Sequence, residues 1–125
     1  MTNANCRGIW VFAEQTEGTL CPTVLELLAK AQDLKQASGG KDPVTAVLMG
    51  QAVEPLAQTL IAHGADAVLL AEHPNLAQYK PRTYKNVLTE LARKYDPSIF
   101  LLPSAMILLL RIHRRASSSV VSARQ

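Results

Sequence analysis

Gly8-Ile9-Trp10-Val11-Phe12-Ala13-Glu14-Gln15 is the most informative stretch of the chain, and Gly18-Thr19-Leu20 follows it after two residues. A short run of β-branched and aromatic residues that ends at polar residues and a glycine is typical of a buried strand. We therefore expect residues 9–13 to form a strand that leads through a loop into an amphipathic helix beginning at Pro22. The apolar stripe of that helix comprises Val24, Leu27, Leu28, Ala31 and Leu34.

The same alternation of strand and helix continues to residue 103. Further strands are predicted over residues 43–49, 67–71 and 98–103, separated by helices from Val53 to Gly64 and from Thr83 to Asp96. Strands without polar alternation, separated by amphipathic helices, predict a parallel sheet covered on both faces. The predicted fold class is α/β: a doubly wound parallel sheet with helices on both faces, incomplete at the C-terminus. Its strands are expected in the order third, second, first, fourth.

Two local details follow for the later helices. Thr83 is expected to cap the third helix, and Asp96-Pro97 to end it, because the residue before proline disfavours the helical conformation. The apolar face of the second helix is expected to comprise Val53, Leu56, Ala57, Leu60 and Ile61.

The composition fits one globular domain. The chain has 125 residues, 48% of them apolar, and its mean hydropathy is +0.06, which argues against disorder. No apolar run reaches the roughly 18 residues that a membrane helix needs. The N-terminal residues also lack the apolar stretch of a signal peptide. We therefore expect a cytoplasmic protein without membrane insertion.

Positive charge is concentrated at the C-terminal end. Residues 1–105 carry nine Lys and Arg against ten Asp and Glu, whereas residues 106–125 carry four arginines and no acid. The apolar run from Met106 to Leu110 has no polar face, and the serines that follow are poor residues for a helix interior. The expected division is a domain over residues 1–105 and an atypical basic tail over residues 106–125.

Three interpretations of this tail stay open. The reading frame can have shifted near Ala105, the tail can be a short surface-binding arginine segment, or it can be a diverged helix with a frayed end. Because the tail offers no clear fourth crossover helix, the fourth strand is expected to lose cover on one face. Apolar surface exposed there would promote association.

Ligands of an open α/β sheet bind at the carboxyl ends of the strands, near the switch in strand order. Gly50-Gln51-Ala52 before a helix could hold a phosphate on free N–H groups, although a plain turn is the simpler interpretation. Glu14 and Glu72 could form a carboxylate pair for acid–base catalysis, although solvated loop carboxylates are the simpler interpretation. The residues expected at this edge are Glu14-Gln15, Gly50-Gln51, Ala71-Glu72 and Pro103-Ser104.

The histidines and cysteines predict no metal centre. His63, His73 and His113 share no ligand spacing, and His63 suits the negative end of the second helix. Cys6 and Cys21 form no CxxC and no Cys/His cluster, so two reduced thiols are expected.

The other reactive side chains predict no catalytic centre. Ser104 lacks the glycine-flanked elbow of a hydrolase nucleophile. Core packing, with the hydroxyl group reaching water, explains Tyr79, Tyr84 and Tyr95 more simply than substrate stacking does. We therefore predict no catalytic, cofactor-binding or metal-binding residue in this chain.

Several short groups of residues, taken in their order and spacing, resemble the start of the α subunit of electron transfer flavoproteins. The resemblance implies an N-terminal α/β domain of the adenine nucleotide α hydrolase-like type, which pairs with a β subunit. It also implies that FAD belongs to a separate C-terminal domain of the full-length protein, so none is expected for this chain alone. The groups are residues 9–14, Leu25-Glu26-Leu27-Leu28-Ala29-Lys30-Ala31, Val47-Leu48-Met49-Gly50, His63-Gly64-Ala65-Asp66-Ala67-Val68 and Asp96-Pro97-Ser98-Ile99-Phe100.

The resemblance implies a part in an electron carrier rather than an enzyme. Such carriers pass electrons from flavin dehydrogenases, such as acyl-CoA dehydrogenases, to a quinone reductase or a similar acceptor. This chain is then a truncated, non-functional or scaffold portion. The alternative is a free-standing nucleotide-binding domain similar to universal-stress proteins. A nucleic-acid binder would rest on four arginines without an aromatic platform, and no nucleic-acid partner is expected.

Overall fold

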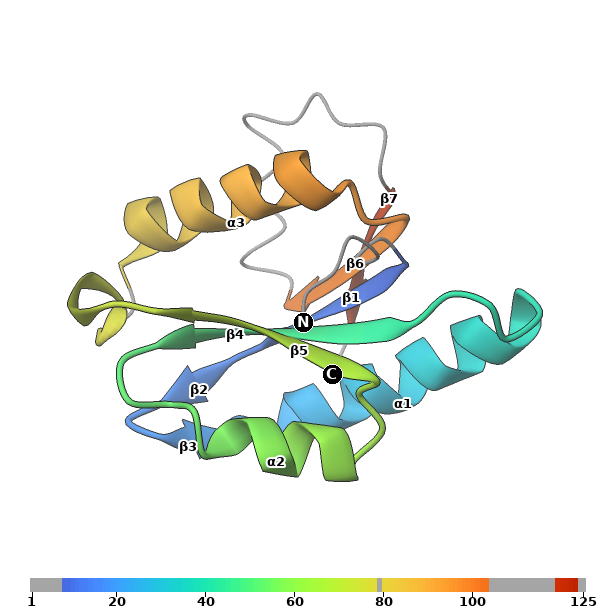
Figure 1. Cartoon of the computed structure of the whole chain (residues 1–125), viewed down its shortest axis with the longest axis horizontal. Helices are drawn as coiled ribbons and strands as arrows, with labels where there is room; N and C mark the ends of the chain where they lie inside the picture. Colours follow the sequence, from blue (N-terminus) through green and yellow to red (C-terminus); the bar gives the residue numbers. More distant parts are fainter. Residues whose placement is uncertain (1–7, 79, 104–118, 124–125) are drawn as a thin grey trace.

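A parallel sheet forms the centre of the molecule (Figure 1). The computed structural model describes residues 8–78, 80–103 and 119–123. The sheet has the strand order β5-β4-β1-β6-β7, so the predicted order third, second, first, fourth is confirmed. Its strands are β1 (Ile9–Ala13), β4 (Val44–Gly50), β5 (Ala67–Glu72), β6 (Ile99–Pro103) and β7 (Ser119–Ala123).

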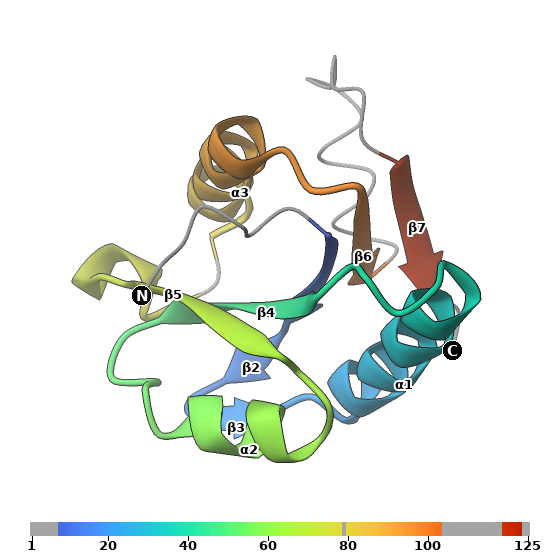
Figure 2. The same ribbon diagram turned by 45° about the vertical axis from the view of Figure 1, so that its right-hand side comes forward.

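Helices cover both faces of the sheet, as predicted. The helices α1 (Pro22–Ala37) and α2 (Leu56–Ala62) lie on one face, and α3 (Pro81–Tyr95) lies on the other (Figures 1 and 2). A short 3-10 helix, η1 (Pro74–Leu76), joins α3 on its face. This layering is the solution expected when strands are apolar on both sides.

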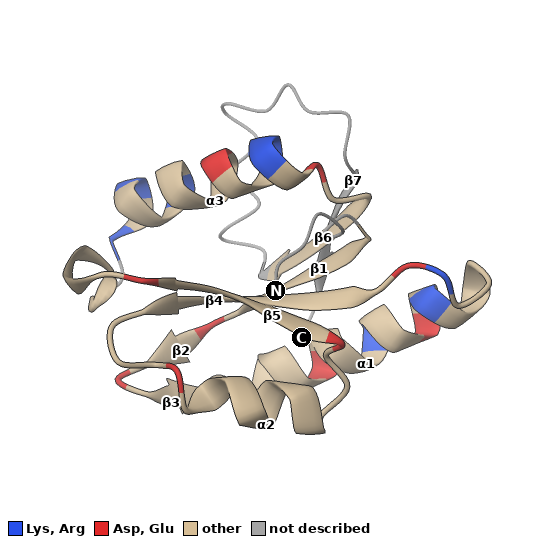
Figure 3. Ribbon diagram, in the orientation of Figure 1, with Lys and Arg blue, Asp and Glu red and all other residues tan. Residues whose placement is uncertain are grey.

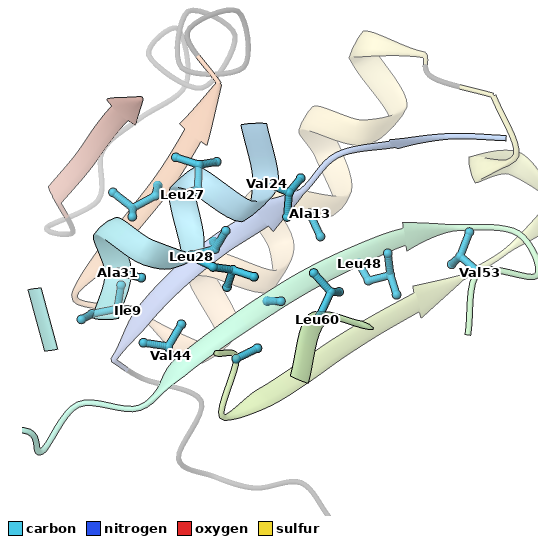
Figure 4. Packing of buried hydrophobic residues seen from close by; sticks show 14 residues of the cluster. Ile9, Ala13, Val24, Leu27, Leu28, Ala31, Val44, Leu48, Val53 and Leu60 are labelled. Carbon is cyan, nitrogen blue, oxygen red and sulfur yellow. The ribbon is translucent and has the colours of Figure 1, made fainter. Parts of the chain in front are cut away.

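The pleat of β1 explains why the chain needs two cores. Ile9, Val11 and Ala13 face the α1 and α2 layer, whereas Trp10 and Phe12 face α3, because successive side chains of a strand point to opposite faces. All five residues are at most 3% exposed. Figure 4 shows the first core, where residues from α1 and α2 pack on β1 and β4.

The core beneath α3 is built around aromatic rings. Trp10 meets Phe100 edge-on with ring centroids 5.2 Å apart, and Tyr95 lies 6.1 Å from Trp10. Phe12 meets Tyr84 edge-on at 6.4 Å. Edge-to-face pairs at these distances add stability beyond the area they bury. The expected core packing of Tyr84 and Tyr95 is confirmed, whereas Tyr79 lies outside the described residues.

The strand entry at Gly8 depends on glycine. Ile9 N–H donates to Pro43 O at 2.9 Å, which aligns β1 with β4. Gly8 has a φ of +109°, and a Cβ atom there would lie 2.5 Å from Pro43 O. Any side chain would therefore displace the backbone at Pro43, just before β4.

The helix boundaries agree with the sequence at α1 and differ at α3. Pro22 is the first residue of α1, as predicted, and the chain leaves α1 through Gly39 at a φ of +93°. By contrast, α3 begins at Pro81 after Lys80, so Thr83 lies inside the first turn and is not its cap. Proline at the first helical position decides this start, because its φ already suits the helix. Asp96 ends α3 in the left-handed conformation.

Two segments carry structure that was not predicted. The expected loop after β1 contains a small hairpin of β2 (Gln15–Thr16) and β3 (Thr19–Leu20). Strand β7 has no counterpart among the predicted strands, yet it pairs with β6 in parallel over its whole length. The predictions for residues 104–118 and 124–125 lie outside the described residues.

The exposed apolar surface is not where it was expected. Phe100, Leu101 and Leu102 of β6 are buried, so the prediction that the fourth strand loses cover is wrong. In β5, by contrast, Leu70 is 37% exposed. Ile61 of the second helix is 50% exposed and does not belong to its buried face. Val53 lies outside the seven-residue helix, although its side chain is buried.

Candidate functional site

The carboxyl edge of β1, β4 and β5 brings together the residues predicted there. Gly50 lies opposite Glu72, and Ala13 lies opposite Leu48. Gln15 lies two residues after the end of β1 and starts the hairpin. The side chains of Gln15 and Glu72 therefore approach the loop after Gly50 from two sides.

Gln15 fills the space beside Gly50. Its Nε2 donates to Met49 O at 3.0 Å, and its Oε1 accepts from Gly18 N–H at 2.9 Å. A Cβ atom on Gly50 would lie 2.6 Å from Gln15 Nε2 and 2.8 Å from Val53 Cγ1. Gln15 thus fastens the hairpin to the end of β4. In the sequence, only the position of the Gln15 amide three residues before Gly18 could have indicated this contact.

Glu72 closes the other side of the same loop. Its Oε2 accepts from Val53 N–H at 3.0 Å, and His73 N–H donates to Gly50 O at 3.0 Å. The following helix begins only at Leu56. The loop after Gly50 therefore does not run directly into a helix, and one of its N–H groups already has a carboxylate partner. The Val53 N–H group is therefore not free to bind a phosphate.

The two candidate carboxylates are not brought together. Glu14 follows β1 and Glu72 ends β5, and β4 lies between these strands. Strands in a sheet are about 4.8 Å apart, so the backbones at Glu14 and Glu72 are separated by roughly 10 Å. Glu72 is engaged by Val53 N–H. The sheet therefore places a strand between the two candidate carboxylates, and Val53 N–H holds one of them.

The described histidines and cysteine have local structural contacts. His63 follows α2, with its Nδ1 2.9 Å from Thr59 O, and His73 Nδ1 accepts from Asn75 N–H at 3.0 Å. Cys21 precedes α1, and its Sγ lies 3.8 Å from Thr23 Oγ1. Within residues 8–78, 80–103 and 119–123, no three His, Cys, Asp or Glu side chains are grouped to hold a metal ion. Cys6, Ser104 and His113 lie outside those ranges.

Tyr84 has a structural role that its sequence position did not reveal. Its hydroxyl group donates to Leu76 O at 2.6 Å, and its ring is buried under α3. This contact ties η1 to α3. The hydroxyl group therefore satisfies a backbone acceptor rather than reaching water.

A hollow lies against α3. Its volume is about 400 Å³, and its described lining residues are Lys85, Asn86, Thr89, Glu90 and Arg93. All of them belong to one helix, which carries much of the positive charge visible in Figure 3. None of the helices in the described part of the chain is both long and apolar enough to cross a bilayer.

Comparison with known proteins adds independent findings. The family model described as the electron transfer flavoprotein domain matches residues 9–115. The chain is 40% identical over 107 residues to the electron transfer flavoprotein subunit alpha of Megasphaera elsdenii, and 36% identical over 107 residues to that of Clostridium acetobutylicum. Each match covers 86% of this chain and 31% of the relative.

A third relative has a more specific name. The acryloyl-CoA reductase electron transfer subunit beta of Anaerotignum propionicum is 36% identical over 101 residues, covering 81% of this chain and 27% of that protein. The chain thus spans less than a third of the length of these curated relatives. The matched family region also ends beyond Ala105, where the domain boundary was expected.

Proposed function

The chain belongs to the electron transfer flavoprotein domain family, and on that premise we propose that it is the N-terminal domain of an α subunit. In this role it serves as a scaffold domain within a two-subunit electron carrier and not as an enzyme. The observation that carries the proposal is the family match over residues 9–115, together with 36–40% identity to α subunits.

The proposal assigns FAD to the part of the full-length protein that these residues do not cover. The relatives are about three times as long as the matched region, since the match covers 31% of each. At the carboxyl edge, the Gln15 side chain occupies the space beside Gly50, and Glu72 holds Val53 N–H. The described residues of this edge do not fit a flavin, and no electron-transfer step is assigned to them.

The proposed partners follow from the family. The first is an electron transfer flavoprotein β subunit, which pairs with this domain in the cytoplasm. Through the complete complex, the carrier serves an acyl-CoA dehydrogenase or another flavin dehydrogenase. Relatives named for an acryloyl-CoA reductase and for a lactate dehydrogenase support a heteromeric setting of this kind. Nucleic acid is not among the proposed partners.

The alternative is a free-standing nucleotide-binding domain. Such a domain needs free backbone N–H groups at the carboxyl edge to receive phosphate. Val53 N–H already donates to Glu72, and this weighs against the alternative. Micromolar binding of AMP or ATP to the purified chain, measured by calorimetry, would favour the alternative over the scaffold role.

A chimaera tests the scaffold role. Residues 8–103 of this chain would replace the matching segment of the Megasphaera elsdenii α subunit, which would be co-expressed with its own β subunit. We expect a heterodimer that retains flavin absorbance and is reduced by its dehydrogenase. A chimaera that folds but neither binds the β subunit nor retains flavin would contradict the proposal.

The boundary between a domain over residues 1–105 and a tail over residues 106–125 also remains a proposal. It rests on the change in charge and composition after Ala105. Sequencing the DNA past codon 105 tests it. A second reading frame that continues the family pattern identifies a frame shift, and its absence leaves the tail as an evolved segment.

A further inference from the structure

We draw no further inference here: the strongest candidate, the apolar edge of the sheet at β5 with Leu70 exposed beside α2, pairs with β4 on one side only among the described strands, and nothing in the structure shows what covers it.

Discussion

Gln15 shows how one side chain can organise a sheet edge. Both ends of its amide are used, one on Met49 O and the other on Gly18 N–H. The amide also takes the space that a side chain at position 50 would need. Gln15 and Gly50 therefore form a matched pair, and changes at the two positions should not be independent.

Gly50→Ala should lower the free energy of unfolding by about 1–3 kcal/mol, because the new methyl group overlaps Gln15 and Val53. Gln15→Ala should lower the free energy of unfolding less in the Gly50→Ala variant than in the wild type. In that variant the loss of the Gln15 hydrogen bonds is partly offset, because removing the Gln15 amide also removes its overlap with the new methyl group. Urea unfolding of the wild type, both single variants and the double variant measures this coupling. Strictly additive effects would refute the close contact.

Glu72 supplies a second contact of the same loop, to Val53 N–H. Glu72→Ala should lower the free energy of unfolding by about 1 kcal/mol, because the N–H group loses its acceptor. Glu72→Gln keeps an acceptor oxygen and is the matched control, with a smaller loss expected. Equal losses in the two variants, measured by urea unfolding, would show that the hydrogen bond does not contribute.

Among the secondary-structure elements, β1 is the one on which both cores depend. It lies between β4 and β6, and its side chains alternate between the aromatic cluster under α3 and the aliphatic cluster under α1 and α2. The sequence predicted this strand well because a fully apolar run is typical of a strand buried on both faces. It did not predict how the opposite layers differ, since that depends on residues from distant elements.

Trp10→Ala should lower the free energy of unfolding by about 4 kcal/mol, because a fully buried ring and its contacts with Phe100 and Tyr95 are lost. Ile61→Ala is the control, since Ile61 is half exposed, and its effect should be within about 0.5 kcal/mol of zero. Guanidinium unfolding followed by circular dichroism measures both. Similar losses in the two variants would contradict the assigned burial.

The helices were predicted with unequal success for a physical reason. In α1 the apolar stripe, the proline at its start and the glycines after its end agree with one another, and such local agreement makes a prediction dependable. In the segment from Val53 to Gly64 the same kind of stripe is present, yet the helix begins only at Leu56. There Ala52 has a φ of +57°, which is outside the helical region, and Glu72 binds Val53 N–H in the loop before the helix.

For the whole molecule, the two edges of the sheet differ from its centre. Among the described strands, β7 extends the sheet past β6, and β5 is the last strand on the other side. The strands between them are bonded on both sides and buried. The free energy of unfolding should therefore depend on the edge strands in two ways. Backbone pairing of an edge strand with its neighbour stabilises the sheet, and apolar surface that an edge strand exposes to water does not contribute to the core.

Ending the chain after Pro103 should lower the urea midpoint of unfolding, because β6 loses its five paired positions with β7. Cross-strand pairs contribute about 0.2–1 kcal/mol each, so five pairs predict a total loss of roughly 1–5 kcal/mol. Ending the chain after Ala123 keeps β7 and is the control. Equal midpoints for the two shortened chains would show that β7 does not support the sheet.

The local sequence was sufficient for the parallel α/β architecture, the central position of β1 and the family resemblance. Hydrophobic period, proline and glycine act over a few neighbouring residues, and their effects can be recognised without knowing what lies opposite. The absence of a convincing catalytic cluster was likewise an inference from residue types and spacing.

Only the tertiary structure decided how the edge residues are used. Gln15 reaches Met49 O and Glu72 reaches Val53 N–H because three strands end side by side. Strand β7 pairs with the edge of β6. The exposure of Leu70 likewise follows from the position of β5 at the end of the sheet. These features depend on pairing between residues far apart in the chain, which no local periodicity encodes.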